Sequence, residues 1–181
     1  TIYESGIIRT TPSPTVAYTI DDPALGAGAD MAGDMHTTMS MLYRDEIDYV
    51  FLGGAQVDKY GNVNSTGIGD NDVASDDFIY VAGSGGANDL GSLGKNSIIM
   101  MPHSPRKVVE KVDFVTTPGY LDGPGARERE GLPAGTGPDT IITTKGILKF
   151  DDETKEAYLQ AYYPGETVEG IQEATGWDLD I

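Results

Sequence analysis

The sequence predicts an α/β fold: an open, largely parallel sheet with an added β-hairpin. Three observations predict it. Short apolar runs end directly in turn residues, two later β-prone segments flank a Lys-Gly turn, and the chain is rich in glycine. The 181 residues include 24 glycines and are 39% hydrophobic, which suits one globular domain rather than a disordered, fibrous or membrane protein. We therefore expect residues 1–181 to form a single domain.

The strands of the sheet are expected at the apolar runs. Three runs of four or five residues lead into Gly or Pro: Tyr49–Leu52, Phe78–Ala82 and Ile98–Met101. Such runs are too short for a helix, and continuous apolar character is typical of parallel strands that are buried on both faces. The sequence therefore predicts a buried parallel strand at each of the three.

The last third of the chain predicts a hairpin and a short helix. Thr140–Thr144 and Ile147–Phe150 flank a Lys-Gly turn, which is typical of a β-hairpin. Thr167 is expected to cap a short helix that Gly176 ends. The apolar residues of this helix, at helical spacing, are Val168, Ile171 and Ala174.

Charge and composition exclude several classes of function. The net charge of −17 argues against nucleic acid and anionic membrane surfaces as partners. No stretch approaches the roughly 18 apolar residues of a membrane span. The absence of cysteine excludes disulfides, thiolate metal sites and cysteine nucleophiles. It fits a reducing cytoplasm, where we expect the protein.

Glu4 is the first candidate for chemistry. It follows what reads as the end of an apolar strand, and the turn residues Ser5-Gly6 follow it. In open α/β sheets, sites gather outside the carboxyl ends of the strands. A carboxylate at such a place acts as a nucleophile, a base or a metal ligand, or else it caps a helix. Its position alone leaves these alternatives open.

A glycine-rich loop is the second candidate. Its candidate oxyanion-stabilising or pantetheine-binding residues are Gly83, Ser84, Gly85, Gly86 and Ala87. Successive small residues let backbone N–H groups approach a ligand closely and converge on an anion. The loop therefore suits an oxyanion or a pantetheine arm, and its alternative role is a tight strand-to-helix turn that binds nothing.

Neutral amide side chains form the third candidate group. Gln56, Asn62 and Asn64 follow the apolar run at residues 49–52. Their side chains suit the orientation of a substrate amide or carboxylate. The alternative is that they cap turns, as Asn commonly does.

A long Gly- and Pro-rich segment runs from Pro118 to Pro138 and contains two arginines. Loops of this length in a compact domain are usually functional or disordered. Arg127 and Arg129 are candidates to meet a phosphate group or a dicarboxylate. Pairing with Glu128 and Glu130 is the alternative.

These blocks, taken in order, resemble a known family. The chain is similar to the core region of the β subunit of glutaconate CoA-transferases, which are family I CoA-transferases. The segments that carry the resemblance are residues 4–6, 53–58, 60–66, 83–88, 98–101, 122–125, 145–151, 161–164 and 178–180. They span essentially the whole chain, and the family's subunit has further sequence at both ends. We therefore expect this domain to lack segments that the native protein has at both ends.

The resemblance implies the open α/β fold of family I CoA-transferases and a hetero-oligomer with an α subunit. It implies that Glu4 is the catalytic glutamate, with coenzyme A as a substrate and neither a metal nor a tightly bound cofactor. In this mechanism the Glu4 carboxylate attacks an acyl-CoA thioester and gives a mixed anhydride and CoA thiolate. The thiolate then returns to form a glutamyl-CoA thioester, and an acceptor acid reverses both steps.

The chemistry that the resemblance implies makes its own demands. A carboxylate is a weak nucleophile, so the reaction needs close positioning and exclusion of water. Each tetrahedral intermediate carries an oxyanion, and loss of one hydrogen-bond donor to it typically costs about 2.7–4 kcal/mol. By resemblance to the family's glycine loop, the backbone of Gly85-Gly86-Ala87 is the candidate donor. We expect Glu4 to be ionised in a partly polar setting.

Three alternatives stay open. The first is a hydrolase of CoA-linked, ring-derived acids on the same fold, against which Glu4 counts because relatives of that kind lack it. The second is a non-catalytic subunit that binds acyl-CoA or has a structural role. The third concerns the substrate: a glutaconate-like dicarboxylate, or a 3-oxoacid or short-chain acid.

Overall fold

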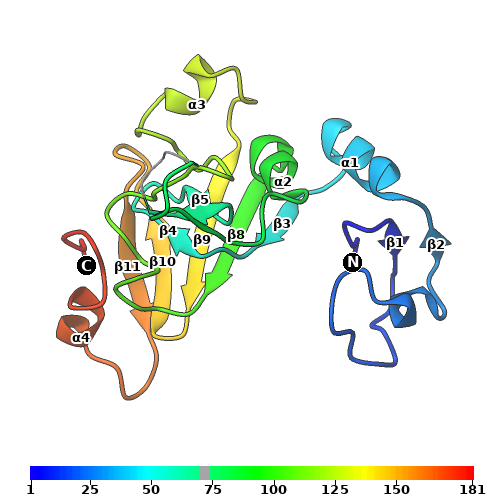
Figure 1. Cartoon of the computed structure of the whole chain (residues 1–181), viewed down its shortest axis with the longest axis horizontal. Coiled ribbons are helices and arrows are strands. Elements are labelled where there is room, and N and C mark those ends of the chain that lie inside the picture. Colours follow the sequence, from blue (N-terminus) through cyan, green and yellow to red (C-terminus); the bar gives the residue numbers. More distant parts are fainter. Residues whose placement is uncertain (70–73) are drawn as a thin grey trace. The chain divides into compact units, whose positions relative to one another are not determined.

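The computed structural model describes residues 1–69 and 74–181. They fall into two compact units, Thr1–Ile47 and Asp48–Ile181, coloured from blue to cyan and from cyan to red in Figure 1. That residues 1–181 act as one CoA-transferase domain stays a prediction.

The second unit is built on a five-stranded sheet in the order β11-β10-β9-β8-β3 (Figure 1). Its strands are β3 (Tyr49–Leu52), β8 (Asn96–Met101), β9 (Gly137–Thr143), β10 (Gly146–Phe150) and β11 (Ala157–Tyr162). β3, β8 and β9 run parallel, whereas β10 pairs antiparallel with both β9 and β11. The parallel strands with an antiparallel addition confirm the predicted fold class, including the hairpin around Lys145-Gly146.

The core of the second unit lies against β8, β9 and β10. Its buried members are Val57, Val63, Ile99, Met101, Val108, Ile141, Leu148, Ala157 and Trp177, with Phe150 and Leu179 packed against them. Alternate residues of β8 face this core, since Ile99 and Met101 are buried while Met100 is half exposed. The two-residue period of a strand therefore selects which side chains of the apolar run are buried.

Short elements connect β3 to β8. They are β4 (Gln56–Val57), β5 (Val63–Asn64), β6 (Gly67–Ile68), β7 (Ile79–Tyr80) and helix α2 (Ala87–Leu93). Gly94 ends α2 close to the sheet, where a Cβ would lie 2.9 Å from the Val50 side chain. Any larger residue at this position would push the helix away from β3.

The predicted strand at Phe78–Ala82 is wrong. Only Ile79–Tyr80 form a strand, which pairs antiparallel with β6 outside the main sheet. Phe78 is buried, whereas Ile79 and Tyr80 are 64% and 67% exposed. The ring of Phe78 packs onto Gly67, where a Cβ would lie 1.9 Å from it. One buried aromatic residue therefore anchors a segment whose other apolar side chains stay on the surface.

The predicted C-terminal helix is present but shorter. Helix α4 (Val168–Gln172) is capped by Thr167, whose side chain accepts a hydrogen bond from Gly170 N–H. A helix α3 (Ala126–Arg129) lies inside the glycine-rich segment at residues 118–138. No helix in the described ranges, 1–69 and 74–181, is long and apolar enough to cross a membrane.

The first unit consists of small elements around a buried arginine. They are β1 (Ile7–Ile8), a 3₁₀ helix (Pro23–Gly26), β2 (Met31–Ala32), which pairs antiparallel with β1, and α1 (Met35–Tyr43). Arg9 is 4% exposed. Its guanidinium donates to the carbonyl oxygens of Leu25 and Ala27 at 2.8 and 2.7 Å. The arginine thereby ties β1 to the 3₁₀ helix.

Candidate functional site

Glu4 lies in a tight turn of the first unit. Ile2 forms an antiparallel bridge with Ile8, and the amide of Tyr3 donates to the carbonyl of Ile7 at 2.9 Å. The turn closes with a 3.0 Å hydrogen bond from Gly6 N–H to the Tyr3 carbonyl. Glu4 is partly exposed. The sequence correctly predicts a turn at this acid, and the turn belongs to a small antiparallel pair.

The turn is anchored at three successive residues. The Thr38 hydroxyl in α1 donates to the Glu4 carbonyl at 2.9 Å. The Ser5 hydroxyl donates to the Ile20 carbonyl at 2.7 Å. The carbonyl of Gly6 accepts from Gly33 N–H at 2.9 Å. This network of contacts with distant residues holds the candidate nucleophile in one backbone geometry.

Gly6 is required in this turn. Its φ is +104°, a region that L side chains rarely adopt. A Cβ there would lie 2.6 Å from the backbone of Gly33 and Asp34. A residue with a side chain would therefore separate the Glu4 turn from the segment that leads into α1.

A small cavity of about 200 Å³ opens beside the turn. Its walls come from Ser5, Ile7, Asp21, Asp22, Pro23 and Gly26. The amides of Ala24 and Tyr18 donate to the Asp22 carboxylate and hold its pKa below the ordinary value. The wall is therefore anionic on one side and apolar at Ile7 and Pro23.

The glycine loop of the second unit leads into α2. Gly83 and Gly85 have φ values of +92° and +50°, which glycine adopts without strain. Gly83 exchanges hydrogen bonds with Ser65: its amide donates to the Ser65 carbonyl at 2.8 Å, and the Ser65 hydroxyl donates to its carbonyl at 2.9 Å. The structure therefore brings the glycine loop together with the segment that holds Gln56 and Asn64.

The amides of this loop differ in what they bind. Gly83 N–H is engaged with Ser65, and Ala87 N–H donates to the Ser84 carbonyl at 2.9 Å. Within the described part of the chain, Gly85 N–H has no hydrogen-bond acceptor, and Gly85 is exposed. Of these amides, that of Gly85 is available to a ligand without breaking a turn.

Gln56 and Asn64 belong to one buried network. Gln56 Oε1 accepts from Asn64 Nδ2 at 2.7 Å and from Asp113 N–H at 3.0 Å. Gln56 Nε2 donates to Asp113 Oδ2 at 3.0 Å. Asn64 Oδ1 accepts from the amides of Thr66 and Gly67. Both amide side chains are thus engaged in holding β4, β5 and the loop after them, and a role in orienting substrate stays a prediction.

Asn62 belongs to a second buried network. Its Nδ2 donates to Asp58 Oδ2 at 3.0 Å and to the Leu121 carbonyl at 2.9 Å, while its Oδ1 accepts from Gly119 and Leu121 N–H. Burial raises the pKa of the Asp58 carboxyl, and hydrogen bonds from Asn62 and Tyr60 oppose that rise. Asn62 therefore ties the β4–β5 turn to the segment that starts at Pro118.

Arg127 holds the glycine-rich segment together. It is 2% exposed. Its guanidinium donates to the carbonyls of Pro118, Gly119, Gly91 and Ser92 and to the Thr136 hydroxyl, at 2.8–3.3 Å. Neither Arg127 nor Arg129 forms an ion pair with Glu128 or Glu130 in the part of the chain that the structure describes. The alternative of pairing with these glutamates is therefore wrong, because Arg127 bonds backbone carbonyls instead, and contact of either arginine with a ligand stays a prediction.

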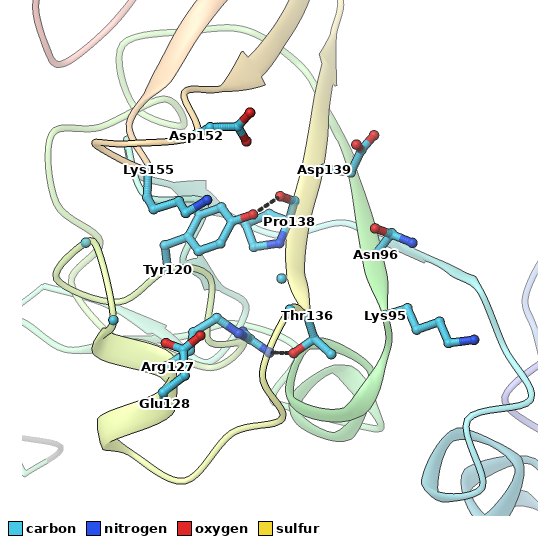
Figure 2. A pocket seen from close by; sticks show the side chains of 14 residues that line it. Lys95, Asn96, Tyr120, Arg127, Glu128, Thr136, Pro138, Asp139, Asp152 and Lys155 are labelled. Atoms are coloured by element: carbon cyan, nitrogen blue, oxygen red, sulfur yellow. Dashed lines mark hydrogen bonds between the residues drawn. The ribbon is translucent and has the colours of Figure 1, made fainter.

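A cavity of about 270 Å³ lies next to Arg127 (Figure 2). Its labelled lining includes Lys95 and Asn96 at the start of β8, and Pro138 and Asp139 near the start of β9. Figure 2 shows the Lys155 side chain beside the Tyr120 ring, with Nζ 5.2 Å from the ring centroid. The cavity is thus at the amino ends of the parallel strands, opposite to the end where sites of open α/β sheets gather.

The site residues predicted from the sequence are divided between the two units. Glu4 belongs to the first, while the glycine loop and the three amide side chains belong to the second. Sequence reasoning missed Thr38, which contacts the Glu4 backbone from 34 residues away. Nothing in the local pattern around a threonine inside a helix signals such a contact. It also missed Asp113, the partner of Gln56.

Comparisons with known proteins agree on one family. A family model described as coenzyme A transferase matches residues 25–174. The B subunit of glutaconate CoA-transferase from Acidaminococcus fermentans is 54% identical over 131 residues, which are 72% of this chain and 48% of that protein. The B subunit of 3-oxoadipate CoA-transferase from Pseudomonas knackmussii is 36% identical over 181 residues, which are 98% of this chain and 67% of that protein.

A solved structure gives the same result. The crystal structure of glutaconate coenzyme A-transferase from Acidaminococcus fermentans matches with a TM-score of 0.91 at 42% identity, covering 99% of this chain and 69% of that one. The matched part of the chain spans about half of the length of the glutaconate relative. Because the family model spans most of the chain and a relative above 30% identity covers nearly all of it, the chain belongs to the coenzyme A transferase family.

Proposed function

We propose that this chain is the subunit of a CoA-transferase that carries the catalytic glutamate, and that Glu4 is this residue. The enzyme moves CoA between an acyl-CoA and a carboxylic acid. The observation that carries the proposal is the Glu4 turn, which is anchored at Glu4, Ser5 and Gly6 in a chain of the coenzyme A transferase family.

The reaction proceeds in two balanced half-reactions. The Glu4 carboxylate attacks the thioester carbonyl, the C–S bond breaks, and CoA leaves as a thiolate from a mixed anhydride. The thiolate attacks the Glu4 carbonyl carbon of the anhydride and expels the donor acid as a carboxylate, which leaves a glutamyl-CoA thioester. An acceptor carboxylate then runs both steps in reverse, so that no external proton or electron is needed.

An anchored turn suits this chemistry because the same carboxyl group must react twice. Its carbonyl carbon has to stay within reach of the thiolate during the life of the anhydride, or water hydrolyses the intermediate. Well-oriented intramolecular reactions gain effective molarities of about 10⁵–10⁸ M. Fixing the backbone at Glu4 supports that orientation.

The glycine loop supplies the candidate oxyanion donor. Gly85 N–H has no acceptor among the residues that the structure describes, so an oxyanion could take this place. The amide of Ala87 is already engaged with Ser84, which makes Gly85 the stronger candidate within the loop. Gly83, Ser84 and Gly86 are proposed to line the path of the CoA arm.

The substrate is proposed to be a glutaconate-like dicarboxylate or a short-chain acid. Glutaconate and 3-oxoadipate, which appear in the names of the two relatives, are both dicarboxylic acids. An α subunit is the proposed partner, since both relatives are named as B subunits. We also propose that the protein acts in the cytoplasm with no tightly bound cofactor or metal.

Borohydride trapping tests the proposal. The chain is assembled with its partner subunit, mixed with an acyl-CoA, and treated with borohydride, which reduces a thioester to an alcohol. Mass spectrometry of the peptide that contains Glu4 should then show the alcohol in place of the carboxylate. Glu4→Gln should remove both the modification and the transfer activity, whereas Glu46→Gln, at an exposed glutamate paired with Arg44 in the same unit, should change neither.

The other outcomes separate the alternatives. Consumption of acyl-CoA with an unmodified Glu4 peptide would contradict the proposal and favour a hydrolase. Binding of acyl-CoA by an assembled complex without any turnover would favour a non-catalytic subunit.

A further inference from the structure

We infer that Thr38 is a positioning residue that orients the Glu4 carboxylate through the Glu4 backbone, an inference that rests on the function proposed above. Thr38 lies in α1, 34 residues from Glu4 in the sequence, and its hydroxyl donates to the Glu4 carbonyl at 2.9 Å. Thr38 is 3% exposed. Water therefore has little access to the hydroxyl from outside.

The Thr38 hydroxyl is itself held in place. It lies 2.9 Å from the carbonyl of Met35, three residues earlier in the same helix. A threonine in a helix has few χ1 rotamers, and one of them places Oγ1 against such a carbonyl. The hydroxyl is thus fixed by its own helix and shared with the Glu4 carbonyl.

The start of α1 is also bonded to the Glu4 turn. Asp34 caps the helix by accepting from Thr37 N–H at 2.8 Å. The preceding residue, Gly33, donates to the Gly6 carbonyl. The helix therefore contacts the turn at two points, next to the cap and one turn of helix later at Thr38.

Holding the Glu4 carbonyl fixes the peptide plane between Glu4 and Ser5. The side chain of Glu4 leaves the Cα next to that plane, so rotation of the plane changes the direction in which the carboxylate points. A misplacement of about 1 Å can cost roughly a hundredfold in rate. Loss of the hydroxyl should therefore act on the chemical steps rather than on acyl-CoA binding.

Loss of the Thr38 hydroxyl should also change the balance between CoA transfer and hydrolysis. Transfer requires the CoA thiolate to find the Glu4 carbonyl carbon of the anhydride, whereas hydrolysis requires only water. A carboxyl group that samples several directions presents the carbonyl less often to the thiolate. The ratio of acyl-CoA hydrolysis to CoA transfer is therefore a signature of positioning, which a general loss of stability would not change.

The experiment compares neighbouring threonines in the assembled complex. Thr38→Val removes the hydroxyl and keeps the shape of the side chain. Thr37→Val is the matched control, because the Thr37 hydroxyl donates to Asp34 Oδ1 at 2.7 Å rather than to Glu4. Timed mixing with acyl-CoA followed by borohydride gives the rate of thioester formation. We expect a decrease of roughly ten- to a hundredfold for Thr38→Val with an unchanged KM for acyl-CoA, a higher ratio of hydrolysis to transfer, and neither effect in the control.

A second pair of variants keeps the test decisive if Thr38→Val does not assemble. Thr38→Ser and Thr38→Ala both remove the methyl group, and only Thr38→Ser keeps the hydroxyl, so the serine variant should retain the wild-type rate and the alanine variant should not. Equal rates and equal hydrolysis ratios in these two variants would overturn the inference. Absence of any trapped thioester in the wild-type complex would instead contradict the proposed function, so the two failures are distinguishable.

Discussion

His103 lies buried just beyond the carboxyl end of β8, with both ring nitrogens near threonine hydroxyls. Nδ1 is 3.0 Å from Thr143 Oγ1, and Nε2 is 3.0 Å from Thr175 Oγ1. The Thr175 hydroxyl donates its proton to the Ile171 carbonyl at 2.8 Å, so Thr175 Oγ1 accepts from the ring at Nε2. The network therefore favours a neutral ring that carries its proton on Nε2.

Protonation of His103 should therefore destabilise the fold. Burial, with Lys145 nearby, lowers the pKa of His103 from 6.5 to about 4. The unfolded chain binds this proton below pH 6.5 and the folded chain only near pH 4. The stabilising contribution is thus complete above pH 6.5 and is lost as the pH falls toward 4, at a cost of up to roughly 3 kcal/mol.

Two measurements check this prediction. The imidazole proton resonances of His103 in NMR spectra should not titrate between pH 7 and pH 5. The loss of unfolding free energy over this range, measured in urea, should be smaller in His103→Gln than in wild type, and His36→Gln, at an exposed histidine, should behave like wild type. A resonance of His103 that titrates near pH 6.5 would contradict the argument.

At the scale of elements, Arg127 joins three segments that are distant in the sequence. It contacts the end of α2 at Gly91 and Ser92, the start of the long loop at Pro118 and Gly119, and Thr136 before β9. Burial lowers the pKa of this arginine, but its ordinary value is far above neutral. The guanidinium therefore acts as a cation whose charge is balanced by several carbonyl dipoles instead of by one carboxylate.

Substitution of Arg127 by lysine should destabilise the second unit. Lysine keeps the charge but cannot reach all of these acceptors, so several buried carbonyls lose their donor. Each such loss costs about 1–3 kcal/mol, and we expect a decrease in unfolding free energy of at least about 2 kcal/mol. Arg129→Lys is the control, because Arg129 makes one exposed 3.3 Å bond to the Pro124 carbonyl. Equal unfolding midpoints in urea for the two variants would show that the network contributes little.

Particular elements show how far the sequence predicts the fold. Burial on both faces was wrongly expected for residues 49–52, because β3 lies at the edge of the sheet and Tyr49 and Phe51 are 54% and 63% exposed. The strands at residues 49–52 and 98–101 and the hairpin around Lys145-Gly146 were themselves predictable from local pattern. The run at residues 78–82 was not, because its burial depends on one aromatic ring packing onto Gly67. The site divides in the same way: a turn at Glu4 follows from Ser5-Gly6, whereas the bond from Thr38 depends on a contact that no local pattern encodes.

At the scale of the whole molecule, acidic residues greatly outnumber basic ones. The chain has 29 Asp and Glu against 12 Lys and Arg. Several of the lysines are already paired, as in Lys59–Glu156 and Lys145–Glu166 at 2.7 and 2.6 Å. Twelve basic residues cannot balance 29 acidic ones, and repulsion between the excess like charges opposes the compact state.

Added salt should stabilise the protein. Raising the ionic strength from about 0.01 to 0.5 M shortens the Debye length from about 30 Å to a few ångströms, so the repulsion is screened and the thermal midpoint should rise. Sodium chloride and sodium sulfate compared at equal ionic strength separate screening from the preferential exclusion of sulfate. A rise with sulfate alone would show that charge repulsion is not the cause.

Trp177 gives the molecule a selective optical reporter. It is the single tryptophan of the chain, it is 7% exposed in the core of the second unit, and its indole N–H donates to the Ala157 carbonyl at 3.2 Å. Excitation at the red edge of protein absorbance therefore illuminates only the second unit. Its emission shift on denaturation therefore reports the unfolding of the second unit, which also holds the glycine loop. The first unit, which holds Glu4, has no tryptophan and gives no such signal. If the two units unfold at different temperatures, the melting curves from fluorescence and from circular dichroism will differ.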